Sequence, residues 1–94
     1  MDEELLLDGL LNNDVRAYQA LRKEYAEDLI IFAYMLLHDG PRAHDVVDRF
    51  LLKLYQENGF SEATLPLHAF LYKRLRKECE TEIWNSFAGP DNAI

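Results

Sequence analysis

Apolar residues recur at steps of three and four between Val15 and Leu36, and this pattern constrains the fold more than any other feature of the sequence. The series comprises Val15, Tyr18, Leu21, Tyr25, Leu29, Phe32 and Leu36. Such spacing follows the 3.6-residue period of an α-helix with one buried face. Further apolar side chains between Ile30 and Leu37 widen this face and can belong to a core or to an interface. The pattern therefore predicts a long helix that lies centrally among other helices.

Breaks on both sides of the long helix define its neighbours. Residues 3–11 form a short amphipathic stretch, and Asn12, Asn13 and Asp14 follow as candidates for the N-cap of the long helix. The segment HDGP ends the long helix, and we expect Gly40 to take the left-handed cap conformation. Pro41 suits the first turn of a third helix.

The third helix shows an inward stripe made of Ala43, Val46, Val47, Phe50, Leu51, Leu54 and Tyr55. We expect a loop over 58–65 and a last helix from Pro66 to Phe87. Only 4 Gly and 3 Pro argue against a turn-rich β fold. The prediction is an all-α compact bundle of one short and three longer helices, with a domain over 1–88 and a disordered tail over 89–94.

The charge of the chain limits its partners. Its net charge of −7 opposes nonspecific binding to nucleic acid or to an anionic membrane, since both require clustered cations. The sequence holds no apolar run long enough to span a membrane, and its acidic start is unlike that of a secretory signal. With the single cysteine, Cys79, these features favour the cytoplasm and predict no contact with a membrane.

Motifs for catalysis or metal binding are missing from the sequence. The histidines His38, His44 and His68 do not pair at helical spacing, so no metal site is predicted. Cys79 falls on the inward stripe of the last helix, which favours a small buried side chain over a nucleophile. No glycine-rich phosphate loop occurs either. We therefore predict that the chain is not an enzyme and needs no cofactor.

Two surfaces remain as candidates for binding. The outer face of the third helix can dock a protein or simply solubilise the helix, and it carries Asp45, Asp48, Arg49, Leu52 and Lys53. The last helix interleaves bases with aromatic rings, a pattern typical of contacts to phosphates and unpaired bases but also of an ordinary basic helix face. Its residues are Tyr72, Lys73, Arg74, Arg76 and Lys77, with Phe70 expected in the core and Tyr72 exposed.

Three segments, in order and at matching spacing, resemble a known family. Residues 43–55, AHDVVDRFLLKLY, resemble the A-E-D-L-V-Q-E-V-F-L-R-L-W helix of bacterial extracytoplasmic-function sigma factors. Residues 13–25, NDVRAYQALRKEY, resemble the family's G-D-x-x-A-F-x-x-L-Y-x-x-Y opening. Residues 67–76, LHAFLYKRLR, are similar to its S-L-R-A-W-L-F-R-I-A-R segment. The similarity covers about residues 3–80.

The resemblance implies a region 2 domain, which is a helical bundle. In that family the domain docks on the clamp helices of the largest RNA polymerase subunit and helps to melt the −10 promoter element. Asp45 matches the family's Asp on the clamp-binding helix, whereas Asp48 and Arg49 stand where Gln-Glu is usual. Lys73 and Arg76 match basic positions on the strand-binding helix.

The family also implies partners for the segment before the last helix. That segment accepts a flipped promoter base in the family, which makes Asn58, Phe60 and Ser61 candidates for contact with single-stranded −10 DNA. An anti-sigma factor is a further partner by family analogy.

The chain departs from the family after Arg76. It continues with KECETE, which places three carboxylates beside the basic residues. Two functional hypotheses therefore stay open beside an unrelated helical bundle: a sigma-like domain that opens promoters, and a sigma-like interaction module without its own DNA role.

Overall fold

Aspartates start the helices of this fold. The computed structural model describes residues 2–87, so the expected tail over 89–94 lies outside the described residues. The Asp2 carboxylate accepts from the Glu4 amide at 3.0 Å, Asp14 from Arg16 at 2.9 Å and Asp39 from Arg42 at 3.1 Å. Each bond satisfies an amide that the first turn of a helix leaves free. The sequence predicts an N-cap within residues 12–14, and Asp14 is the residue that supplies it.

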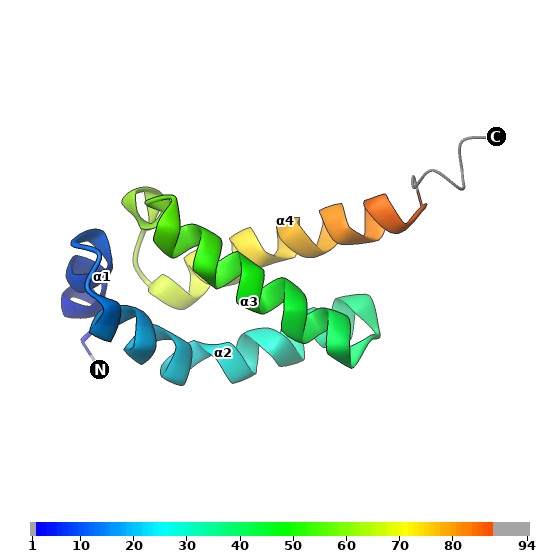
Figure 1. Cartoon of the computed structure of the whole chain (residues 1–94), viewed down its shortest axis with the longest axis horizontal. Helices are drawn as coiled ribbons and strands as arrows, with labels where there is room; N and C mark the ends of the chain where they lie inside the picture. The colour runs from blue at the N-terminus through cyan, green and yellow to red at the C-terminus, as the bar shows by residue number, and fades with distance from the viewer. Residues whose placement is uncertain (1, 88–94) are drawn as a thin grey trace.

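These caps open helices α1 (Glu3–Leu11), α2 (Val15–Leu37) and α3 (Gly40–Gln56), which are followed by the short 3-10 helix η1 (Gly59–Glu62) and by α4 (Leu67–Phe87). Within residues 2–87 there is no strand. Figure 1 shows the chain reversing direction between α2 and α3 and again between α3 and α4. The predicted all-α bundle of one short and three longer helices is confirmed.

The turn after α2 differs from its expected form, and the turn after α3 requires a glycine. His38, and not Gly40, takes the left-handed conformation after α2, with φ 55°, because Gly40 is already the first residue of α3 and Asp39 caps that helix. At the end of α3, Asn58 is left-handed with φ 57°. A Cβ on Gly59 would lie 2.5 Å from Leu54 Cδ2, so close approach of η1 to α3 is what requires glycine there.

The core forms where α2 packs against α1, α3 and α4. Its buried side chains include the predicted inward stripes of α3 and α4, except that Tyr55 of α3 and Ile83 of α4 are half-buried. The apolar face of α2 is centred on Leu21, Leu29 and Ala33. Val15, expected to face inward, is exposed, whereas Ala17 and Tyr18 in the same turn of α2 pack against the core. α3 packs against both α2 and α4, which also contact each other, and its outward face carries the candidate site.

Candidate protein and nucleic-acid interface

The outer face of α3 is built by its core stripe. Because its apolar side chains turn inward, all five candidate docking residues are exposed: Asp45, Asp48, Arg49, Leu52 and Lys53. Leu52 and Asp45 are seven residues apart and therefore lie above one another, two helical turns apart. Leu52 is 43% exposed and supplies an apolar centre to an otherwise charged face.

Ion pairs connect the charged residues of this face to the helices on its two sides. Arg22 of α2 donates to Asp48 at 2.8 Å, which raises the pKa of the arginine and draws Asp48 toward α2. Arg49 donates to Asp45 at 2.9 Å and lies 3.6 Å from Glu82 of α4. Asp48 therefore faces one neighbouring helix and Arg49 the other, with Leu52 between them.

The segment before α4 differs from the expected loop. Residues 59–62 form η1, and Asn58 and Ser61 are exposed as a contact to DNA requires. The Phe60 ring, however, is only 2% exposed and packs 6.4 Å from the Phe70 ring, measured between centroids. Phe60 is a core residue, so the prediction that it contacts a base is wrong.

The basic residues of α4 do not form one continuous surface with Tyr72. Lys73, Arg76 and Lys77 are exposed, whereas Tyr72 is half-buried against Phe32 of α2, edge to face with centroids 5.0 Å apart. Arg74 lies on the opposite side of α4 from Tyr72, since a separation of two residues corresponds to about 200° around a helix. The expected exposed ring beside the cations is therefore corrected: Tyr72 packs toward α2.

Arg74 is held in place by two neighbours. Its Nη2 donates to Glu62 Oε2 at 3.0 Å, and its guanidinium carbon lies 5.4 Å from the centre of the Phe70 ring. In contrast, Lys73, Arg76 and Lys77 make no ion pair within residues 2–87. Three of the four bases are thus free to meet a ligand.

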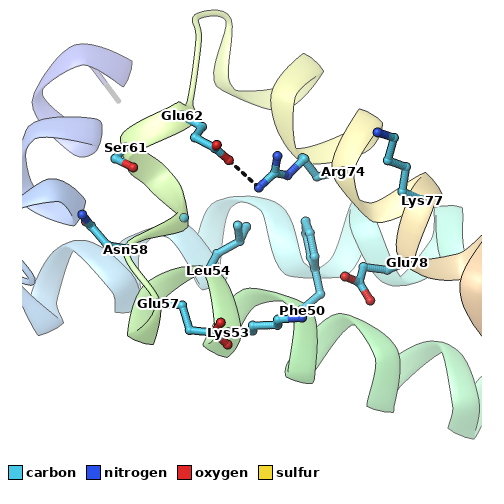
Figure 2. Close-up of a pocket in the computed structure, with 11 residues that line it drawn as sticks. Phe50, Lys53, Leu54, Glu57, Asn58, Ser61, Glu62, Arg74, Lys77 and Glu78 are labelled. Atoms are coloured by element: carbon cyan, nitrogen blue, oxygen red, sulfur yellow. Dashed lines mark hydrogen bonds and ion pairs between the residues drawn. The ribbon is translucent and has the colours of Figure 1, made fainter.

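A cavity of about 480 Å³ brings both predicted sets together between α3, η1 and α4 (Figure 2). Phe50 and Leu54 form its apolar floor. Five candidate residues line it: Lys53 from the docking set, and Asn58, Ser61, Arg74 and Lys77 from the DNA-binding set. Glu57, Glu62 and Glu78 also line it, so three carboxylates balance the three bases.

A second hollow of about 320 Å³ continues along α3 and is lined by Arg49, Leu52 and Lys53 on one side and by Glu78 and Glu82 on the other. Glu82 also lies 3.4 Å from Arg42, at the start of α3. Two of the three carboxylates in the KECETE segment therefore face α3. The sequence signals neither these contacts nor the Arg74–Glu62 pair, because their partners are far apart in the chain.

Cys79 is buried beneath this region. Burial, followed by the charges of Glu78, Glu82 and Glu80, raises the pKa of its thiol to about 11. The thiol therefore stays protonated at neutral pH, and its role is that of a small packed side chain.

Comparisons of the chain with models of protein families, with curated proteins and with solved structures find no match. Among residues 2–87, no group of three or more His, Cys, Asp and Glu side chains is placed to hold a metal ion. Nor does any helix in that range have the length and apolar character needed to cross a membrane.

Proposed function

We propose that the chain acts as a sigma-like region 2 domain, which binds RNA polymerase through α3 and holds one strand of a melted −10 element with α4. One observation carries the proposal: Lys53 of the docking set lines the same cavity as Arg74 and Lys77 of the basic set. A domain that grips a polymerase and a DNA strand together needs the two surfaces side by side. The proposal implies action in the cytoplasm, where transcription takes place.

Docking would use the exposed face of α3. Leu52 offers an apolar anchor, and the charges of Asp45 and Lys53 lie on either side of it to fix register. The Arg22–Asp48 and Arg49–Glu82 pairs hold the flanking side chains before the partner arrives. Such pre-organisation lowers the entropy lost on binding.

Strand capture would use phosphate contacts and hydrogen bonds. Lys73, Arg76 and Lys77 can each meet a phosphate, and Asn58 and Ser61 offer amide and hydroxyl groups to a base that is turned out of the stack. Phe60 and Tyr72 are packed and take no part in stacking. Three phosphate contacts predict a shallow salt dependence, with a slope of about −2 in log K against log salt.

Retention by core RNA polymerase tests the docking step. Leu52→Glu should weaken binding at least about tenfold, since a charge would replace the apolar anchor. Leu11→Glu is the matched control, because Leu11 of α1 is 41% exposed and lies outside α3. If the two variants bind alike, or if the unaltered chain is not retained, docking through α3 is refuted.

Promoter-dependent transcription separates this function from the alternative of an interaction module without a DNA role. The paired Arg74 and the remaining Glu80 near the bases favour that alternative. Lys73→Glu combined with Arg76→Glu should abolish transcription while leaving polymerase retention intact. If transcription is unchanged, the chain is the interaction module.

A further inference from the structure

The apolar segment at the end of α2 has more side chains than the core can accept. Ala33 is buried, whereas Ile31, Tyr34 and Met35 point outward with 52%, 51% and 66% of their surfaces exposed. Surface apolar residues are ordinary when scattered singly, but three on adjacent turns of one helix form a patch. Nothing within residues 2–87 covers it.

One turn earlier, the same face of α2 is acidic. Glu24, Glu27 and Asp28 are exposed and make no ion pair within the described part of the chain. The six positions cover about 120° around the helix axis, at about 100° per residue, and so share one face, which we call the α2 stripe: Glu24, Glu27, Asp28, Ile31, Tyr34 and Met35. At 1.5 Å per residue the stripe is about 16 Å long, or three helical turns.

We infer that the α2 stripe is a docking surface for a cationic amphipathic helix of another protein. The acidic half would pair with Lys or Arg side chains, and the apolar half would receive anchors spaced at i, i+3 and i+4. A partner helix of three turns matches the stripe in length. Charge complementarity would set the direction in which the partner lies.

Other occupants fit this surface less well. Nucleic acid and anionic lipid are repelled by the three carboxylates at 24, 27 and 28. A second copy of the chain would bring an equally acidic stripe, whose carboxylates would repel those of the first. A cationic amphipathic helix complements both the acidic half and the apolar half of the α2 stripe.

The stripe lies apart from the α3–α4 face. Arg22 and Phe32, which contact α3 and α4, lie on other sides of α2. The partner can therefore bind while the α3–α4 face is occupied, and the inference does not rest on the proposed function.

The test titrates the whole chain with two synthetic peptides of about 14 residues and identical Lys and Leu content. In one peptide the residues form an amphipathic helix, and in the other the order is scrambled. Amide chemical shifts and calorimetry then follow binding. We expect shifts confined to 24–38 and an affinity at least about tenfold higher for the amphipathic peptide.

Matched variants identify the surface. Glu27→Lys should weaken binding about fivefold, whereas Glu80→Lys, an equal change of charge on α4, should change it less than about twofold. Met35→Glu should likewise weaken binding, and Leu5→Glu, at an exposed leucine of α1, should not. Circular dichroism checks that each variant keeps its helices.

Three results would overturn the inference. The first is equal binding of both peptides, and the second is equal effects of Glu27→Lys and Glu80→Lys. The third is a dimer of the chain alone, detected by sedimentation and abolished by Met35→Glu, since the stripe would then be covered by a second copy.

Discussion

Replacing Glu62 with Gln should increase the affinity of the chain for single-stranded DNA. The change removes the carboxylate that holds Arg74 at 3.0 Å, while the contact of Arg74 with the Phe70 ring remains. Both partners are solvent-accessible, with side chains 39% and 67% exposed, and exposed pairs contribute about 0.2–1 kcal/mol. Released to a phosphate, Arg74 should therefore strengthen binding by about 1.4- to 5-fold.

The salt dependence of binding provides a second measure of the same contact. One more phosphate contact should steepen the slope of log K against log salt by about 0.7 for a single strand. Fluorescence anisotropy of a labelled oligonucleotide over a salt series measures both quantities. Glu27→Gln, an equal loss of charge on the far side of α2, is the control. If Glu62→Gln changes neither affinity nor slope beyond this control, Arg74 does not contact the strand.

Two further predictions concern groups inside the bundle. The raised pKa of Cys79, about 11 against an ordinary 9.0, means that the folded chain keeps a proton that the unfolded chain loses. Stability should therefore fall as pH rises from 9 toward 11, by up to about 2–3 kcal/mol, and the urea-midpoint difference between the unaltered chain and Cys79→Ala should shrink over this range. The Glu3 carboxylate accepts from the Leu67 amide at 2.9 Å and from the Tyr25 hydroxyl at 3.3 Å, and its charge, after burial, raises the pKa of Tyr25. Glu3→Ala should lower the free energy of unfolding by about 1–3 kcal/mol and lower the Tyr25 pKa in an ultraviolet titration, whereas Glu3→Gln should retain most of the stability. Equal losses of stability in both variants would contradict this prediction.

Features set by local sequence were predictable. The inward stripe of α3 and the cap at Asp14 depend on helical periodicity and on a side chain next to its own helix. The left-handed residue after α2 was misassigned, because both His38 and Gly40 can end a helix and only packing chooses between them. Local patterns thus predict the position of each helix in the sequence more reliably than the conformation of the turns between helices.

Features set by tertiary contacts were not predictable. Phe60 lies in a polar segment, and its burial depends on Phe70 in another helix. The orientation of Tyr72 likewise depends on another helix, since its ring packs against Phe32 of α2 and away from the basic residues of α4. The Arg22–Asp48 pair joins residues 26 positions apart, a distance at which the sequence carries no pairing signal.

Helical geometry reduces the electrostatic objection to DNA binding. The basic segment 73–77 is followed directly by Glu78, Glu80 and Glu82 in the sequence, yet about 100° per residue separates neighbours around α4. Glu78 and Glu82, one turn apart, face α3, where Glu82 lies near two arginines. Of the three carboxylates, only Glu80 lies on the outward side of α4 with Lys73 and Arg76. A phosphate approaching this side therefore meets the cations Lys73, Arg76 and Lys77 and one carboxylate, and the same geometry lets Glu82 pair with the arginines of α3.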